Sequence, residues 1–382
     1  MSEDRVLLAH GDGGELMAEL IEEVFVSRLG TGEPPGDDSA LIRRGEEAKR
    51  REVSRLKPAV PGAKRRGGEK SSGEQAETFG TQREEARRRG VEGTRRLVFT
   101  TDAFVVEPIF FPGGDIGRLA VCGTVNDLAA AGARPAALSA SFILEEGLLI
   151  SELERVVDSM ARAAEKAGVR VICGDTKVVP RGKADKLYIS TSGVGEVPEG
   201  VEVSGAGAKA GDIVIVSGPV GDHGLAVLSV REGLEFESPI VSDCAPLAGL
   251  VAEVLAAAPD VHVLRDPTRG GLATALNEIA RQSGVEIEIE EGAVPVRPAV
   301  AAACELLGLD PLYAANEGKI IAIVAAREAE AALRAMRGHE LGGEAVVIGK
   351  VVEGGGRVLL KMALGTHRIL DRHVGEQLPR IC

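Results

Sequence analysis

Short apolar strands alternate with amphipathic helices along most of the chain, and this alternation limits the possible folds more than any other feature. Strand-like apolar runs lie at 97–102, 169–173, 187–194, 213–216, 285–290, 319–324 and 345–352. Apolar residues at helical spacing cover 118–131, 151–167 and 327–337. A break rich in Gly, Ala and Ser at 201–210 divides the series into two halves. The pattern predicts an α+β protein, built of α/β layers in two domains.

Composition sets the boundaries of these domains. We predict a Gly-rich segment and helix at 1–35, a first domain at 36–200, a second domain at 201–355 and a flexible tail at 356–382. From 43 to 96 the chain holds 17 Lys/Arg and 9 Asp/Glu, a net charge of +8 that leaves −21 for the remainder. Because 43–95 contains no run able to build a core, we predict a disordered basic insertion there. A solvated linker without a function would have the same composition.

Charge and cysteine content exclude several classes of protein. The net charge of −13 and the 3% aromatic content argue against binding to nucleic acid. No apolar run reaches membrane-spanning length, and the first residues do not resemble a signal peptide. The five cysteines include no C-x-x-C pair, which is typical of a reduced, cytoplasmic protein without a structural zinc site.

The chain ends on a cysteine, Cys382. Pro379 stiffens the segment before it, and Arg380 places a positive charge two residues from the sulfur, which favours the thiolate. Such an arm can carry a nucleophile into its own active site or into a partner's. A frayed end whose last residue is Cys is the alternative.

Four aspartates follow apolar strands or lie in an apolar helix: Asp38, Asp102, Asp127 and Asp175. Hydrogen bonding within a turn would explain three of them singly. If the four carboxylates converge, their repulsion requires a divalent cation, and Mg²⁺ bridging phosphates is the default.

Gly-rich turns before helices offer anion sites, because free backbone N–H groups point out of a helix start. One turn contains Gly11, Gly13 and Gly14, and an ordinary capped helix start would look the same. A second contains Asp266, Thr268, Gly270 and Gly271. Lys177 is placed to meet a phosphate, or to be a plain surface lysine.

These motifs together carry a family resemblance. They are His10–Gly14, Asp38–Ala40, Thr100–Asp102, Phe111–Gly114, Cys122–Asp127, Gly174–Lys177, Asp266–Gly271, Ala315–Lys319 and Pro379–Cys382. The chain resembles the HypE family of hydrogenase maturation proteins, within the superfamily of aminoimidazole ribonucleotide synthetase, selenophosphate synthetase and thiamine-monophosphate kinase. The resemblance covers nearly everything except 43–95, where a short connection is usual. It implies a two-domain synthetase-like fold whose first domain binds nucleotide and forms a homodimer.

The resemblance implies a specific chemistry. Similar proteins accept a carbamoyl group on the terminal cysteine from the carbamoyltransferase HypF and use ATP to dehydrate it to a thiocyanate. The cyanide then passes to iron on the HypC–HypD complex. On this basis Cys382 is the acceptor, and Asp38, Asp102, Asp127 and Asp175 bind or position Mg²⁺ and ATP. Further nucleotide contacts are assigned to Thr101, Asn126 and Thr176.

The base that takes the N–H proton is assigned to Glu317, which lies in a Gly-flanked turn before a strand. A structural role for Glu317 and a role as base for His10 both stay open. Two other functions also stay open: a small-molecule kinase or synthetase of the same fold with an inert tail, and a scaffold that binds ATP only to hold partner proteins.

Overall fold

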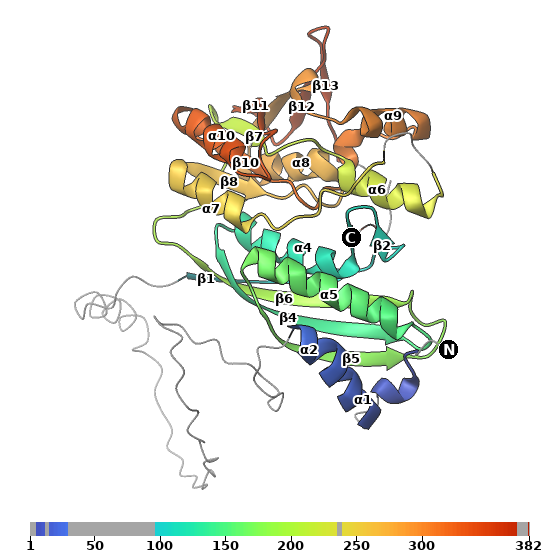
Figure 1. Cartoon of the computed structure of the whole chain (residues 1–382). Helices are drawn as coiled ribbons and strands as arrows, with labels where there is room; N and C mark the ends of the chain where they lie inside the picture. Colours follow the sequence, from blue (N-terminus) through green and yellow to red (C-terminus); the bar gives the residue numbers. More distant parts are fainter. Residues whose placement is uncertain (1–4, 12–14, 30–95, 235–238, 373–380, 382) are drawn as a thin grey trace, which may run out of the picture. The chain divides into compact units, whose positions relative to one another are not determined.

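The computed structural model describes residues 5–11, 15–29, 96–234, 239–372 and 381. Figure 1 shows these residues arranged in two halves, each built on its own main sheet. The predicted insertion at 43–95 lies outside the described residues. The α+β class and the two-domain layout predicted from the sequence are confirmed.

The first half is built on a four-stranded sheet in the order β1-β6-β4-β5, in which only β4 and β5 run parallel. A hairpin of β2 and β3 lies beside it. The elements of this half are η1 (Leu8–Gly11), α1 (Glu15–Leu20), η2 (Ile21–Val26), α2 (Ser27–Leu29), β1 (Arg96–Phe104), β2 (Phe110–Phe111), β3 (Gly114–Asp115), α4 (Ile116–Ala130), β4 (Arg134–Glu145), α5 (Ile150–Ala167), β5 (Val171–Val179) and β6 (Leu187–Val197).

Helices α4 and α5 lie side by side on one face of this sheet (Figure 1). Helix α5 is amphipathic, buries Leu153, Val156 and Met160, and ends at Gly168, whose φ of 68° is left-handed. Helix α4 is buried nearly all round, because it also packs against α7 and β8 of the second half. Gly117 allows the close approach of α4 to α5, since a Cβ there would lie 2.3 Å from the carbonyl oxygen of Val156.

The other face of the four-stranded sheet carries exposed apolar side chains. Leu97 and Phe99 on β1 are 62% and 71% exposed, and Ile143 on β4 points to the same face. Pairing across the sheet places Asp175 of β5 on this face as well. We refer to it below as the open face.

The second half is a seven-stranded sheet in the order β13-β12-β9-β11-β7-β10-β8. Only β9 and β12 pair in parallel. Its elements are β7 (Ile213–Val216), α6 (Asp222–Arg231), α7 (Ala248–Ala257), β8 (Val261–Arg265), α8 (Gly271–Ser283), β9 (Glu286–Glu290), η3 (Glu291–Ala293), α9 (Pro298–Leu307), η4 (Pro311–Tyr313), β10 (Ile321–Val324), η5 (Ala326–Glu328), α10 (Ala329–Gly338), β11 (Val346–Val352), β12 (Val358–Lys361) and β13 (His367–Ile369).

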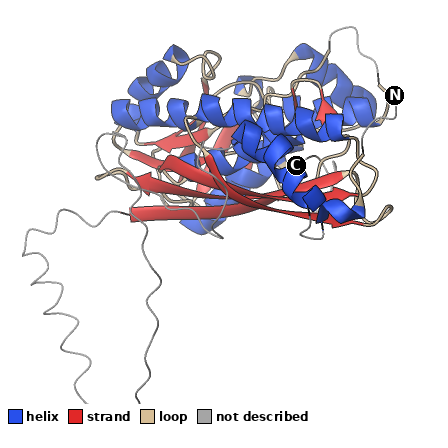
Figure 2. Cartoon of the chain, turned by 60° about the horizontal axis from the view of Figure 1, so that its bottom comes forward, coloured by secondary structure: helices blue, strands red, loops and turns tan. Residues whose placement is uncertain are grey.

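Helices cover both faces of this larger sheet. Helix α8 packs on one face, with Val216 and Ile323 beneath it, and α7 and α10 pack on the other, over Ile215 and Ala322. Strand β10 is therefore buried at every position, which explains its unbroken apolar run. In Figure 2, where the view is turned by 60°, long helices (blue) lie against the strands (red).

Two predicted boundaries differ from the structure. The sheet of the second half continues through β12 and β13, so it extends beyond the predicted boundary at 355. The strand-like run predicted at 169–173 continues in the structure, so the Gly174–Lys177 stretch lies inside β5. Gly174 is needed there because a Cβ would lie 2.3 Å from the carbonyl oxygen of Ala140 on the neighbouring strand.

Candidate active site

Four acidic side chains gather where the two halves meet. Asp102 comes from β1, Asp127 from α4, Asp266 from the turn after β8, and Glu317 from the loop before β10. Burial raises the pKa of Asp102, and the nearby charge of Asp127 raises it further. Burial also raises the pKa of Asp127, whose Oδ2 accepts a hydrogen bond of 2.9 Å from the Thr100 hydroxyl. The raised pKa values indicate that these buried carboxylates are more stable when they hold a proton or lie beside a cation.

Glu317 is the most deeply buried member of the group, at 3% exposure. Its Oε1 is buried and has no hydrogen-bond partner among the described residues. Burial, followed by the charges of Asp266 and Asp243, raises the pKa of Glu317 well above its usual value. A buried carboxyl oxygen without a partner is rare in folded proteins, and it is typical of a group held ready for a ligand or a proton.

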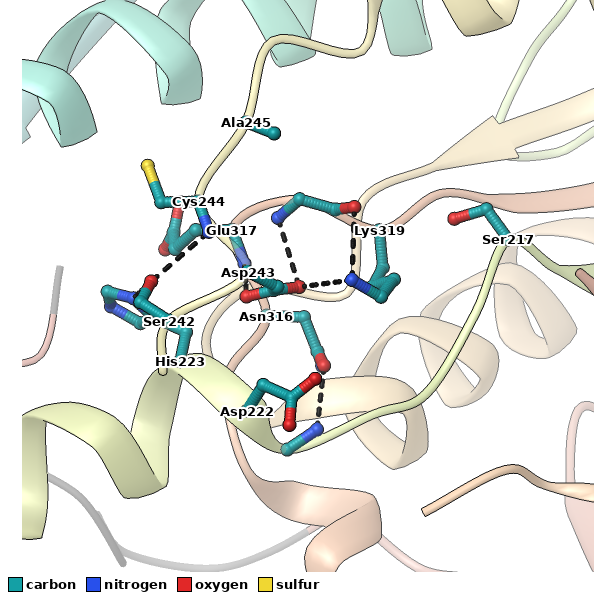
Figure 3. A network of polar contacts seen from close by, with 12 residues as sticks. Ser217, Asp222, His223, Ser242, Asp243, Cys244, Ala245, Asn316, Glu317 and Lys319 are labelled. Carbon is teal, nitrogen blue, oxygen red and sulfur yellow. Dashed lines mark hydrogen bonds and ion pairs between the residues drawn. The ribbon is translucent and has the colours of Figure 1, made fainter. Parts of the chain in front are cut away.

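Asp243 holds the Glu317 loop in place (Figure 3). Its carboxylate accepts hydrogen bonds from the backbone N–H groups of Glu317 (3.1 Å) and Gly318 (3.2 Å). It also accepts one from Lys319 Nζ at 3.0 Å. Asp243 was not predicted as a site residue, because it lies in a loop without a motif and meets its partners about 75 residues along the chain.

Two buried asparagines join the loops around this group. Asn126 Nδ2 donates to the carbonyl oxygens of Ala245 and Glu317, both at 3.1 Å. Its Oδ1 accepts from the Leu247 N–H at 2.8 Å. We predicted a nucleotide contact for Asn126, but its side chain is 1% exposed and bonded within the protein at both ends, so it ties α4 to the second half. Asn316 joins two loops of the second half: its Oδ1 accepts from the Gly221 N–H (2.7 Å), and its Nδ2 donates to the Pro267 carbonyl (3.0 Å).

The C-terminal end of the chain reaches this region. Ile381 is 4% exposed and packs in the core of the first half, with Val227, Cys244 and Ala315 of the second half in the same cluster. Its carbonyl oxygen lies 2.6 Å from Nε2 of His223, the second residue of α6. The tail was predicted to be flexible, and its penultimate residue is buried instead.

Several predicted site residues lie away from the acidic group within this chain. Asp175 and Lys177 (3.4 Å apart) and Thr101 lie on the open face, whereas Asp102 points to the helix-covered face. Thr176 is buried on that helix-covered face, but in β5, at the sheet edge opposite β1. His10 and Gly11 lie in η1, which contacts β5. Asp38, Gly13, Gly14 and Cys382 lie outside the described residues.

The turn at 266–271 packs closely against the segment at 312–314. A Cβ on Gly271 would lie 2.6 Å from the carbonyl oxygens of Leu312 and Ala314, and Gly270 has a left-handed φ of 72°. The Gly271 N–H donates to the Thr268 carbonyl at 2.9 Å. Close packing thus accounts for Gly271, and the left-handed backbone accounts for Gly270. The turn still presents Arg269, whose charge acts on both Asp102 and Asp127.

Comparisons with known proteins identify the fold and the family. Residues 86–197 match the AIR synthase related protein family, N-terminal domain, and residues 209–361 match its C-terminal domain. Carbamoyl dehydratase HypE of Cupriavidus necator is 50% identical over 379 residues, covering 99% of this chain and 95% of the relative. The chain belongs to the HypE family. It is an enzyme, and its relatives are named carbamoyl dehydratases.

Solved HypE structures agree with this assignment. The crystal structure of hydrogenase maturation protein HypE in complex with ATP is 44% identical, has a TM-score of 0.81, and covers 98% of this chain and 99% of that one. HypE in a HypE–HypF complex is 47% identical, with a TM-score of 0.71, over 76% of this chain and 99% of that one. Among the described residues of this HypE-family chain, no helix is long and apolar enough to cross a membrane.

Magnesium is predicted at Asp38, Asp102, Asp127 and Asp175, and of these Asp102 and Asp127 lie in the acidic group. Among the described residues, no set of three His, Cys, Asp or Glu side chains is arranged to hold a metal ion. Mg²⁺ in nucleotide sites is commonly held by one or two carboxylates together with phosphate oxygens. Asp102 and Asp127 supply two carboxylates whose pKa values are both raised, so a cation beside them would relieve an unfavourable charge. The residues therefore fit Mg²⁺ bound together with a nucleotide.

The pKa of Asp266 gives a prediction for this HypE-family protein without ligands. Burial, with the charge of Asp127 second, raises the pKa of Asp266 to about 7. The folded state thus binds this proton more tightly than the unfolded state, so the contribution to stability is present at low pH and is lost as pH rises through about 7. We expect Asp266→Asn to raise the thermal midpoint by a few degrees at about pH 8 and not at about pH 4.

Thermal unfolding of both proteins at the two pH values tests this. Asp371→Asn, which removes an exposed carboxylate, serves as the matched control and should change neither midpoint. A gain for Asp266→Asn that is equal at both pH values would show that the pKa of Asp266 is not raised by folding.

Proposed function

We propose that this enzyme dehydrates a carbamoyl group carried on its own terminal cysteine, with ATP, to give a thiocyanate for hydrogenase maturation. One observation carries the proposal: Ile381, which precedes Cys382, is buried, and its carbonyl oxygen lies 2.6 Å from His223. His223 is hydrogen-bonded to Ser242, the neighbour of the Asp243 that holds the Glu317 loop. On this proposal, the thiol of Cys382 acts beside this group of buried acids.

The chemistry balances as follows. The thiolate of Cys382 accepts a carbamoyl group, which gives S–C(=O)–NH₂. The carbamoyl oxygen attacks the terminal phosphorus of ATP, ADP leaves, and the carbon now carries a phosphate leaving group. Loss of that phosphate and of the two N–H protons leaves S–C≡N. In the net change, ATP and the thiocarbamate become ADP, phosphate, thiocyanate and one released proton. The carbamoyl oxygen and the other N–H proton end in the phosphate.

Glu317 is our choice for the base that takes an N–H proton. Its Oε1 has no partner among the described residues, so it is free to accept a hydrogen bond from a docked thiocarboxamide. Burial and the neighbouring acids raise its pKa, which makes its carboxylate a stronger base than an exposed glutamate. His10 is a weaker candidate within one chain, because η1 lies against β5, at the far edge of the sheet from Asp102.

We propose that Asp102 and Asp127 bind Mg²⁺ with the phosphates of ATP, with Arg269 close by. Bound Mg²⁺ would neutralise charge that develops on the transferred phosphoryl group. Asp175, Lys177 and Thr101 stay proposed nucleotide contacts, but from the open face. A second copy of the chain packed on the exposed Leu97 and Phe99 would cover that face, which supports the predicted homodimer. The predicted roles of Asp38, Thr176, Thr268, Gly13 and Gly14 stay untested.

The partners follow from the same chemistry. We propose that HypF donates the carbamoyl group to this chain, as the HypE–HypF complex of a relative suggests. The HypC–HypD complex is the proposed acceptor of the cyanide. A cytoplasmic location stays a prediction, supported by four free cysteines among the described residues.

The acidic pair can be tested by substitution. Asp102→Asn and Asp127→Asn should each abolish turnover of Mg-ATP while leaving the fold intact. The reason is that removing one charge from a repelling pair costs little stability without metal. Steady-state phosphate release and thermal unfolding measure the two effects. Glu165→Gln at an exposed position of α5 is a control, and a parental rate in both test variants would refute the assignment.

The requirement for a loaded tail tests the proposed function itself. ATP hydrolysis should need carbamoylated Cys382 and should stop after one turnover per chain. Hydrolysis driven by a free small substrate would indicate a kinase or synthetase instead. Absence of hydrolysis under both conditions would indicate a scaffold that only binds ATP.

A further inference from the structure

The buried histidine of α6 has a geometry suited to holding the tail. We propose that His223 is a positioning residue, which docks the tail through the carbonyl oxygen of Ile381. It thereby sets the fraction of enzyme molecules in which the tail is docked for dehydration. This inference rests on the proposed function, because it assigns a step to the docked tail. Three observations support it: the direction of the hydrogen bonds, the burial of both partners, and the lack of another described acceptor for the donor of His223.

The hydrogen bonds run in one direction. A carbonyl oxygen only accepts, so the 2.6 Å contact requires that His223 Nε2 carries the hydrogen. Nδ1 is then the acceptor, and it receives the hydroxyl hydrogen of Ser242 at 2.8 Å. The oxygen of Ser242 in turn accepts from the N–H of Cys244 at 3.1 Å (Figure 3). This chain fixes both the tautomer and the orientation of the ring.

Because both partners are buried, the contact between His223 and Ile381 stabilises the docked tail. His223 is 0% exposed, and its ring meets the edge of Phe111 at 5.3 Å between centroids. Burial lowers its pKa, so the ring is neutral. If Ile381 withdraws, the Nε2–H loses the acceptor that it has in the structure, and an apolar side chain leaves the core. An unsatisfied buried donor is unfavourable, so the tail is held in its docked position.

The proposed reaction needs both positions of the tail. Transfer of the carbamoyl group from a separate donor protein requires the thiol to be accessible at the surface, whereas dehydration requires it near Glu317. A residue that only stabilises the fold would slow both steps. A residue that shifts the tail toward the docked position favours the second step and opposes the first. Weakening His223 should therefore change the two steps in opposite directions.

The experiment uses the full chain and His223→Phe, which keeps an aromatic ring against Phe111 and removes both hydrogen bonds. Protein that is already carbamoylated should dehydrate about tenfold more slowly in a single turnover, as expected when the buried hydrogen bond that docks the tail is lost. Carbamoylation by the donor should be as fast as in the parent or faster, and ATP affinity should be unchanged. His223→Gln places an amide N–H near the position of Nε2 and should restore most of the rate.

Two further variants complete the design. Ser242→Ala, a milder change, should slow dehydration less than His223→Phe and in the same direction. His262→Phe removes a partly buried histidine contact elsewhere in the second half, at 2.7 Å to Asp212, and should leave both steps unchanged. Equal slowing of both steps in His223→Phe, or slowing by His262→Phe as large, would overturn the proposal, as would a failure of His223→Gln to recover.

Hydrogen exchange separates this proposal from the proposed function. The C-terminal peptide of His223→Phe should exchange at least severalfold faster than that of the parent, while the thermal midpoint stays within a few degrees. If the parent formed no thiocyanate, the proposed function would fail, yet this measurement would still judge the docking contact. Unchanged exchange of the tail peptide would overturn the role of His223.

Discussion

Cys382→Ala should bind ATP and unfold at the parental temperature, yet accept no carbamoyl group and form no thiocyanate. The reaction needs a thiolate, and neither a methyl group nor a serine hydroxyl provides one at neutral pH. The buried anchor of the tail is the side chain of Ile381, which this substitution retains. Intact mass after incubation with the carbamoylating system measures the effect, which should be a complete loss.

The matched control is Cys173→Ala, because Cys173 is an exposed cysteine in β5 on the open face. That variant should load and dehydrate a carbamoyl group as the parent does. A carbamoyl adduct on Cys122 or Cys244 in the Cys382→Ala variant would contradict the assignment, since both of those thiols are buried in the core.

Glu317→Gln should stop the reaction one step later. The variant should accept the carbamoyl group at the parental rate and then retain it, with dehydration reduced by about 10²–10⁴-fold, the usual contribution of a positioned base. An amide of the same shape keeps the backbone contacts with Asp243 and Asn126 but accepts no proton. Single-turnover formation of thiocyanate measures the loss, and Glu305→Gln on the exposed side of α9 is the control.

The same substitution, which slows the reaction, should make the folded protein more stable at alkaline pH. Because the pKa of Glu317 is raised in the folded protein, its proton stabilises the fold at low pH, and that contribution is lost as pH rises through the raised pKa. Glutamine does not ionise, so Glu317→Gln should unfold at a higher temperature than the parent at alkaline pH. A variant that is less stable and still dehydrates the carbamoyl group would show that Glu317 is structural.

Local sequence patterns predicted much of the fold. Helix α5 was predicted from its apolar stripe and its closing Gly168, and both signals lie in consecutive residues. The apolar run of β10 and the apolar residues of α4 are local signals of the same kind. Strand β4 was missed, because its start is rich in Ala and contains Pro135. The motif acids Asp102 and Asp127 were found because each lies beside an apolar segment of its own.

The rest of the site depends on contacts between distant parts of the chain. Asp243 is recognisable only once the loop at 316–319 lies against it, and His223 only once Ile381 has reached it from 158 residues away. Asn126 lies in a motif next to Asp127, so the sequence suggested a ligand contact, whereas the structure uses it to join the halves. Successive side chains of a strand point to opposite faces of the sheet. Asp175 lies within the predicted motif, but this alternation places it on the open face.

The most direct test of the account follows the carbamoyl oxygen. The full chain is loaded by the carbamoylating system with a heavy-oxygen label in the carbamoyl group, and the C-terminal peptide is weighed before and after ATP is added. We predict a carbamoyl adduct on Cys382 that loses one water only when ATP is present, with the label recovered in inorganic phosphate. An adduct that loses water without ATP, or a label that stays out of the phosphate, would contradict the account.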